Sequence, residues 1–286
     1  MFQVKYPQLG FAHPCVLHII LALSAAHLAR IRPQQDEHYA ALGEQHSQCA
    51  LRTASEAMAV LDANNCQAVY VASNLICLYM LGKGPSDGDF LLFGRQKGVS
   101  WANLVHGVRN ITQFFDHSVL FAGLLPSTAQ DKPAALKHTS AYEEGRAAVE
   151  WESAFLKLRE LVTKGSSTDG ESTCYLHELD NLELCYKASE GQHGSHLFEV
   201  GEENKTILVW IWRLGDDFYT ALDGNRPLAL LVFAFFCPLL KTLNRQRWFT
   251  RRWPEHILCH IRRSLDARWL ASLEWAEAQT WMQAGR

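Results

Sequence analysis

The segment HPCVLHIILALSAAHLA, residues 13–29, decides the fold because its apolar side chains recur at helical spacing on more than one face. One face, with steps of four and three residues, carries Leu17, Leu21, Ser24, Leu28 and Ile31. A second face carries Val16, Ile19 and Leu23, so we expect a helix that is buried nearly all round. Pro14 fits the first helical turn, where its missing N–H costs nothing, and Pro33 ends the helix.

The same helical spacing continues along the chain and predicts an all-α fold of roughly ten helices in a single domain, residues 1–286. A second long helix is expected over 34–61, with an inner stripe made of Tyr39, Leu42, His46, Cys49, Thr53, Ala57 and Val60. Further helices are expected over 66–81, 91–105, 108–125, 142–162, 171–188 and 204–222, and the last two begin near Pro227 and Pro254. Loops rich in glycine, proline and serine separate several of them.

Composition places the chain among ordinary globular proteins with a large core. Of its 286 residues, 48% are hydrophobic and 20% are charged. A chain of this length buries about 75% of its unfolded surface, so it needs neither a disulfide nor a metal to fold. The net charge of −3 lacks the basic excess that is usual in a stand-alone DNA-binding protein.

The eight cysteines are spread along the chain, and no two are closer than eleven residues. This spacing excludes zinc sites built on C-x-x-C pairs and favours free thiols in a reducing compartment, the nucleus or the cytoplasm. The apolar segment 16–29 resembles a signal peptide, but His18 and His27 interrupt it and no basic cluster precedes it, so we do not expect one. No membrane span is expected, because the longest later apolar run, 228–240, contains Pro238 and is shorter than the roughly 20 residues that a span needs.

Several segments together resemble a known family. The residues that carry the resemblance are His13–Ala29, Tyr39, His46, Ala50-Leu51, Phe90-Leu91-Leu92-Phe93-Gly94, Trp101, Leu104, Gly107-Val108-Arg109, Arg226–Leu230, Trp248, Trp253, Ile261 and Trp269. In order and spacing they resemble the fungal-specific regulatory domain of zinc-cluster transcription factors, and within it the sterol-uptake regulators. The resemblance runs from about residue 11 to residue 276 and is weakest over 126–204.

This resemblance implies a regulatory domain that binds a sterol or a similar apolar metabolite and modulates transcription by RNA polymerase II. It also implies homodimers, or heterodimers with related transcription factors. The chain departs from the family pattern in two places. The six-cysteine cluster that contacts DNA is missing, so we expect no direct DNA binding from this chain alone, and Trp275-Ala276 stands where the closing motif often has Trp-Pro.

The last third of the chain is unusually aromatic, since seven of the nine tryptophans follow residue 209. Such side chains either line an apolar ligand pocket or pack a core. Combined with the resemblance, the pattern leads us to expect a ligand site lined by Leu230, Phe233, Phe236, Leu240, Trp248 and Trp253.

Arginines alternate with aromatic residues in RQRWFTRRW, residues 245–253. This pattern is compatible with a grip on a nucleic-acid backbone and its bases. It is also compatible with a connection whose arginines complete a helix C-terminus and whose tryptophans point inward, and we favour that second interpretation.

Motifs for catalysis or metal binding are incomplete. His256 and His260 have the spacing of a two-histidine metal face, but no glutamate lies between them. Asp216, Asp217 and Asp223 resemble the acidic motif of terpene cyclases, but Thr220 stands where that motif needs a carboxylate. The loop 82–84 lacks the order of a phosphate-binding loop, and no G-x-S-x-G elbow occurs. We therefore expect no metal, no cofactor and no enzymatic activity.

The leading expectation is thus a ligand-sensing regulatory module for an apolar small molecule. Two alternatives stay open. One is a ligand-free interaction protein that dimerises with full-length zinc-cluster factors and dampens them. The other is an enzyme of secondary metabolism built on a reused regulatory fold, because a fold does not determine a function.

Overall fold

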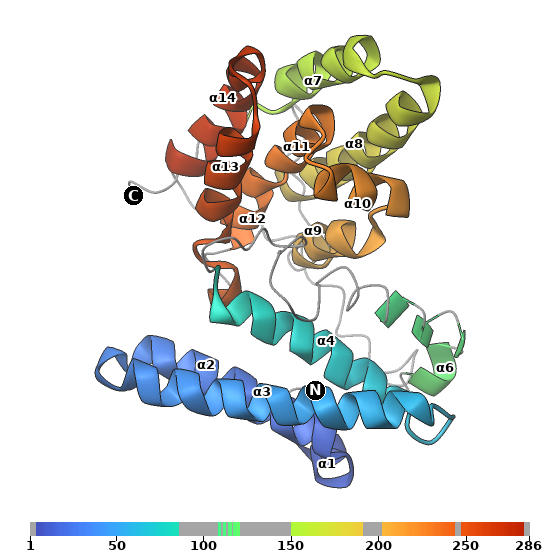
Figure 1. The fold of residues 1–286 in the computed structure, drawn as a ribbon, viewed down its shortest axis with the longest axis vertical. Helices are drawn as coiled ribbons and strands as arrows, with labels where there is room; N and C mark the ends of the chain where they lie inside the picture. The colour runs from blue at the N-terminus through green and yellow to red at the C-terminus, as the bar shows by residue number, and fades with distance from the viewer. Residues whose placement is uncertain are drawn as a thin grey trace, which may run out of the picture. The chain divides into compact units, whose positions relative to one another are not determined.

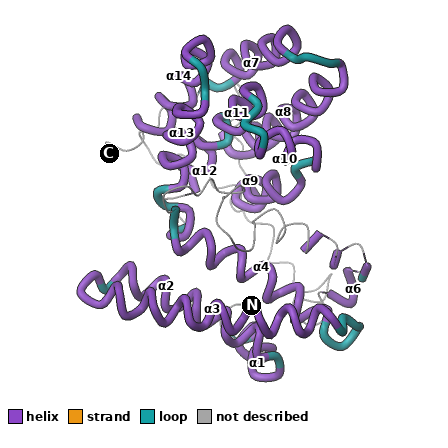
Figure 2. Tube along the Cα trace, in the orientation of Figure 1, coloured by secondary structure: helices purple, strands orange, loops and turns teal. Residues whose placement is uncertain are grey.

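All regular structure in the described part of the chain is helical (Figure 1, Figure 2). The computed structural model describes residues 4–85, 108–109, 111–112, 114–115, 117–120, 150–190, 202–243 and 247–282. Over these ranges there is no strand, which confirms the predicted all-α class. The helix predicted over 91–105, and most of the one over 108–125, lie outside the described residues.

The chain divides into two compact units, Met1–Lys132 and Pro133–Arg286. Each unit is described by itself below. The prediction that residues 1–286 form one regulatory domain stays a prediction.

Unit 1 is built around a helical hairpin with a third helix packed on it. Its elements are α1 (Lys5–Ala12), α2 (Pro14–Ile31), the 3-10 turn η1 (Pro33–Gln35), α3 (Asp36–Ala59), α4 (Cys66–Lys83) and α6 (His117–Leu120). The proline signals were informative, because Pro14 occupies the first turn of α2 and Pro33 follows its end. The short helix α1 was not predicted.

The buried face of α3 is made of small side chains, and the inner stripe predicted for this helix was wrong. On α3 the buried residues are Gly43, Ser47, Ala50 and Ala54. The predicted stripe lies beside them, and its last member, Val60, is 71% exposed. On α2, Val16 and Ile19 are buried as predicted, together with Ala22 and Ala25. Leu21 and Ile31 are exposed, so this helix is not buried all round. Small residues let two helix backbones approach closely, which buries that face in preference to the larger side chains beside it.

By length and composition α2 also qualifies as a membrane-crossing helix, with a mean hydropathy of 1.6 over 18 residues, of which 28% lie buried. A second qualifying segment would be a broken span in which residues 216–223 and 227–243 are bent by 106°. In the structure α2 packs against α1, α3 and α4, so its apolar character has an explanation in the core of unit 1. The predicted absence of a membrane span stays a prediction.

Unit 2 contains more and shorter helices than predicted. Its elements are α7 (Glu152–Gly165), α8 (Asp169–Glu190), α9 (Glu202–Arg213), α10 (Asp216–Asp223), α11 (Pro227–Ala234), α12 (Cys237–Leu243), η2 (Trp248–Thr250), α13 (Trp253–Ser264) and α14 (Ala267–Met282). The predicted helix 204–222 is broken at Gly215, whose backbone is extended and precedes α10. Likewise, four helices lie in the segment from Pro227 onward instead of two, because the chain also breaks before α12, which has Pro238 in its first turn, and at Leu265-Asp266 before α14.

The centre of unit 2 is α11, whose residues from Leu228 to Ala234 are all buried. Five helices pack against it: α7, α8, α10, α13 and α14. Figure 1 shows α11 surrounded by these elements, with α12 continuing from its end. The apolar run noted in the sequence is therefore the core of this unit.

A histidine pair joins α2 to α3. The Nδ1 atoms of His18 and His46 lie 3.0 Å apart, and the rings are partly buried. A hydrogen bond between two imidazole nitrogens needs one protonated and one unprotonated nitrogen, so it exists only while at least one ring is neutral. Burial lowers the pKa of His18, and the charges of His46 and Arg52 lower it further.

We expect acid to loosen the α2–α3 hairpin. Because the pKa of His18 is lower in the folded chain than in the unfolded chain, the unfolded chain binds the proton more readily. The contribution of His18 to the free energy of unfolding is therefore fully present above the unfolded pKa of about 6.5 and declines as the pH falls below it.

Hydrogen exchange of α2 amides, corrected for intrinsic rates, should show this loss of stability. His18→Gln should flatten the dependence, whereas the control His38→Gln, at an exposed position of α3, should retain it. An unchanged profile in His18→Gln would contradict the assignment.

Two buried glycines are expected to respond oppositely to alanine. A Cβ at Gly43 would meet Tyr79 Oη at 3.4 Å and Ala22 O at 3.5 Å, which are ordinary contacts. Gly43→Ala should therefore raise the free energy of unfolding by about 0.5–1 kcal/mol through helix propensity. A Cβ at Gly10 would lie 3.2 Å from the backbone N and Cα of Leu17, so Gly10→Ala should destabilise unit 1. Denaturant unfolding followed by circular dichroism measures both, and a gain in Gly10→Ala would refute the close approach of α1 and α2.

Candidate functional site

The six residues predicted to line a ligand site all lie in unit 2, and five of them are buried. Leu230 and Phe233 are on α11, Phe236 is in the turn after it, and Leu240 is on α12; none of the four has measurable exposure. Trp253, the first residue of α13, is 3% exposed, and Trp248 in η2 is partly exposed. The structure thus places the set in and around the core of the unit.

Two of the predicted residues meet in a group of three nearly parallel rings, which we call the stacked triad: Trp210, Phe233 and Phe236. The ring centroids of Trp210 and Phe236 are 5.0 Å apart with an interplanar angle of 27°, and those of Trp210 and Phe233 are 6.1 Å apart at 24°. Phe233 and Phe236 are themselves 6.0 Å apart at 25°. The triad brings α9, α11 and the α11–α12 turn together in one apolar aromatic group.

The two tryptophans among the predicted site residues, Trp248 and Trp253, are not part of the stacked triad and make other ring contacts. Trp248 contacts Phe249 edge-on, with centroids 6.0 Å apart. Trp253 contacts His256 one turn further along α13, at 6.1 Å. The ring contacts of the structure therefore bring Phe233 and Phe236 together, and place Trp248 and Trp253 at the junction of η2 and α13.

A second aromatic cluster lies around Phe235 and was not foreseen in full. It consists of Trp151, Phe155, Tyr186, Phe235 and Trp275, whose paired ring centroids are 4.6–6.4 Å apart. The Tyr186 hydroxyl also donates to the Phe235 carbonyl at 2.7 Å. Apolar spacing along α7, with buried Phe155, Leu158 and Val162, was the available signal for this cluster.

A buried carboxylate fixes the junction between α9 and α10 beside the stacked triad. Glu178 on α8 is 2% exposed, and its Oε1 accepts a hydrogen bond from the Gly215 N–H at 2.9 Å. Its backbone carbonyl accepts a hydrogen bond from Trp210 Nε1 at 3.1 Å. A Cβ at Gly215 would lie 3.3 Å from the same Oε1, so this position favours glycine. The indole of the triad is thereby oriented by α8.

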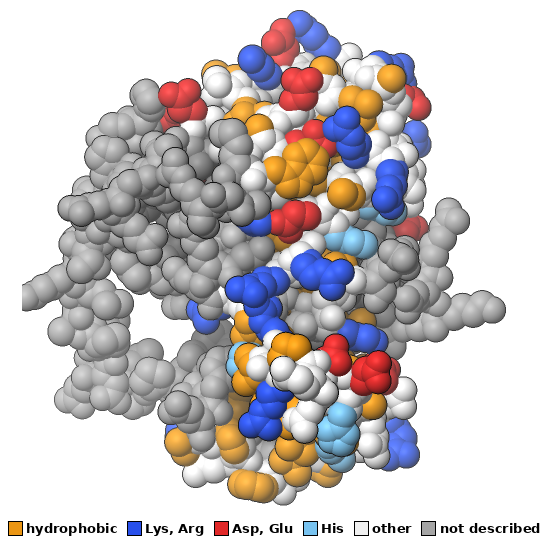
Figure 3. Space-filling view, turned by 90° about the vertical axis from the view of Figure 1, so that its left-hand side faces the viewer, with side chains coloured by type: hydrophobic (Ala, Val, Ile, Leu, Met, Phe, Trp, Pro, Cys, Tyr) orange, Lys and Arg blue, Asp and Glu red, His pale blue; other side chains and the backbone are white. Residues whose placement is uncertain are grey.

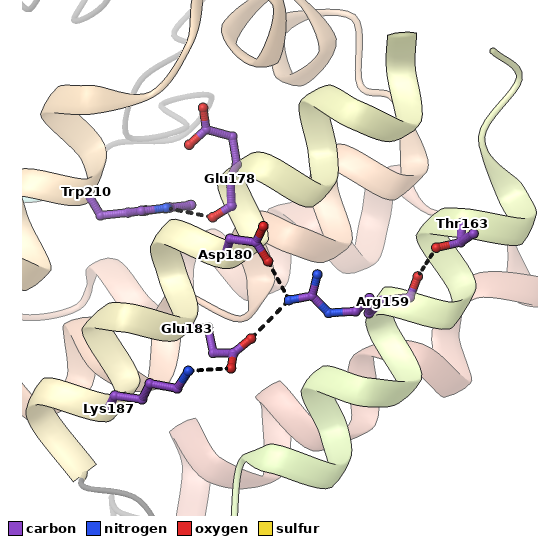
Figure 4. Close-up of polar contacts among 7 residues, drawn as sticks. All are labelled: Arg159, Thr163, Glu178, Asp180, Glu183, Lys187 and Trp210. Atoms are coloured by element: carbon purple, nitrogen blue, oxygen red, sulfur yellow. Dashed lines mark hydrogen bonds and ion pairs between the residues drawn. The ribbon is translucent and has the colours of Figure 1, made fainter. Parts of the chain in front are cut away.

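The opposite side of this stretch of α8 is linked to α7 by ion pairs (Figure 4). Arg159 Nη2 on α7 lies 2.6 Å from Asp180 Oδ1 and 3.0 Å from Glu183 Oε2. Lys187 pairs with the other oxygen of Glu183 at 2.9 Å. These groups are partly exposed, so the ion pairs help to align α7 with α8 but contribute only modestly to stability.

The structure gives no metal chemistry to the other motifs. Over the described residues, no three His, Cys, Asp or Glu side chains are grouped as metal ligands. His256 and His260 lie on the same helix, and burial, with the charges of His256 and Arg263, lowers the pKa of His260. Asp216 and Asp217 occupy the first turn of α10, where negative charge complements the helix dipole.

The most deeply buried cysteines are poorly suited to nucleophilic chemistry. Burial raises the pKa of Cys185 to about 12 and raises the pKa values of Cys77 and Cys237 strongly. The thiolate is the nucleophile, so these thiols stay protonated and unreactive near neutral pH.

No family model, no curated protein and no solved structure matches this chain. The resemblance to zinc-cluster transcription factors therefore depends on the residues quoted in the sequence analysis.

Removal of one triad ring should be costly. Phe236→Ala is expected to lower the free energy of unfolding of unit 2 by about 3–5 kcal/mol, because it deletes a fully buried ring and leaves a cavity. Trp281→Ala, at a side chain that is 42% exposed, should change it by no more than about 0.5 kcal/mol. Denaturant titration followed by circular dichroism compares the two. Similar small effects would mean that the triad is loosely packed.

Proposed function

We propose that this chain is a helical regulatory module that senses an apolar metabolite, such as a sterol, and modulates transcription by RNA polymerase II through a partner protein. It would belong with the zinc-cluster transcription factors and act in the nucleus or the cytoplasm. In this proposal unit 2 holds the ligand and has no catalytic role.

The stacked triad is the observation that supports this proposal. Three near-parallel aromatic rings from α9, α11 and the α11–α12 turn form a buried apolar group, and a rigid polycyclic ligand would stack against such rings. Leu230 on α11 and Leu240 on α12 add aliphatic side chains to the same core. Because the rings contact one another, the ligand would replace some of these ring contacts. It would therefore select an open conformation that is a minor state of the free protein.

A second candidate function is a ligand-free interaction protein, and one observation favours it. Phe233 and Phe236 have no exposed surface and touch Trp210, as side chains of an ordinary close-packed core do. In that case the aromatic residues would stabilise unit 2, and function would lie in dimerisation with a related transcription factor.

Energy transfer from tryptophan to a fluorescent sterol distinguishes the two candidates. We expect saturable transfer with the full chain. Phe236→Leu should weaken binding about tenfold, since it removes a stacking contact worth roughly 1.5 kcal/mol. Phe155→Leu is the matched control: it removes a buried ring from the second aromatic cluster and should leave sterol affinity unchanged.

Two results would count against ligand sensing. One is no saturable transfer by the folded wild-type chain, together with no lipid in a solvent extract of the purified protein. The other is equal weakening in both variants, which would attribute the effect to stability. Sedimentation of the chain with a full-length zinc-cluster factor would then test the interaction candidate.

A further inference from the structure

The junction that leads into α13 presents arginines around a pair of aromatic rings. Arg247 is extended, Trp248–Thr250 form the 3-10 turn η2, Arg251 is extended again, and Arg252 precedes α13. The three arginines are exposed, while Trp248 and Phe249 are partly exposed and Thr250 is buried. We call residues 247–252 the arginine corner.

The positive charge of the arginine corner is not neutralised within the described part of the chain. No ion pair of Arg247, Arg251 or Arg252 occurs there, and the nearest carboxylate in sequence, Glu255, pairs with Lys241. On the face drawn in Figure 3, side chains of both signs are interspersed with apolar ones. The unpaired guanidinium groups of the corner would attract an anionic ligand.

The backbone of the corner is held in an unfavourable conformation. Arg252 has φ 69°, in the left-handed region that is unfavourable for a bulky residue. Asn225 is the other described non-glycine residue with positive φ, but asparagine tolerates this region well. A hydrogen bond holds the turn before Arg252 in this conformation: the hydroxyl Oγ1 of the buried Thr250 donates to the Arg247 carbonyl at 2.9 Å. Strain of this kind is characteristic of positions whose side chain is needed by function.

We propose that the arginine corner binds single-stranded nucleic acid. Guanidinium groups match phosphate oxygens in bidentate geometry, and partly exposed aromatic rings offer faces on which bases stack. Trp248 and Phe249 are partly exposed in the turn between these arginines. The segment also connects two helices, as in the interpretation we favoured: the Arg247 N–H donates to the Leu243 carbonyl at the end of α12, at 2.7 Å, and Trp253 is buried. That arrangement leaves the guanidinium groups of the arginine corner exposed.

Fluorescence anisotropy of the full chain with a labelled oligouridine or oligothymidine of about 20 nucleotides tests the proposal. Three phosphate contacts predict a slope of log affinity against log salt concentration of about −2.

Arg252→Gly should weaken binding about tenfold and reduce the magnitude of this slope by about 0.7. This variant is informative because glycine relieves the positive φ, so the melting temperature should not fall. Arg251→Gln should also weaken binding, whereas Arg263→Gln, at an exposed position near the other end of α13, should not.

Three results would overturn the proposal. The first is no binding at low salt. The second is binding that is equal in wild type and Arg252→Gly. The third is retention by vesicles of anionic lipid without binding of the oligonucleotides, which would identify a membrane surface as the partner. A lower melting temperature for Arg252→Gly would remove the argument from strain, and Arg251→Gln would then decide the site.

Discussion

Burial of the apolar run from Leu228 to Leu240 is the constraint on which the architecture of unit 2 depends. Every residue of this run is buried, and none has a polar side chain that could face water. Each fully buried Leu or Phe side chain favours the folded state by about 1.5–3 kcal/mol, so the surrounding helices are organised to cover the run. Pro238 has no N–H and interrupts the helix, which leaves carbonyl groups without a helical partner near Ala234 and Phe235. The Tyr186 hydroxyl satisfies the Phe235 carbonyl at 2.7 Å, and this bond ties the break in the core to α8.

How far the fold could be predicted depends on which physical signal each element carries. The bounds of α2 were predictable because prolines mark both ends, and Cys66 was correctly placed at the start of α4 after an asparagine turn. The buried face of the hairpin was not predictable from hydropathy, since Gly43, Ser47 and Ala50 are buried for their small size and not for their apolar character. The break at Gly215 was missed for a related reason: only the tertiary contact with Glu178 shows why glycine stands there.

The candidate site was predictable to the extent that its residues are neighbours in sequence. Phe233 and Phe236 lie three positions apart and do stack, as residues of one helical face can. Trp210 and Tyr186 complete the two aromatic groups from 23 and 49 residues upstream of Phe233 and Phe235, respectively, and no local periodicity could specify that pairing. The same limit applies to Trp248 and Trp253, whose aromatic character did not place them in the stacked triad.

The contacts around Trp210 determine what an opening of the stacked triad would disturb. Its Nε1–H bond to the Glu178 carbonyl means that a displaced indole must either pull on α8 or lose a buried hydrogen bond, which costs about 1–3 kcal/mol. The same glutamate holds Gly215 through its side chain, so α10 would be disturbed together with α9. From α8 the ion pairs of Arg159 lead on to α7. A ligand that displaced the Trp210 ring would therefore meet resistance from α8. Its affinity for the open state would have to exceed the cost of that buried hydrogen bond, because a ligand shifts a conformational equilibrium only by its difference in affinity between the two states.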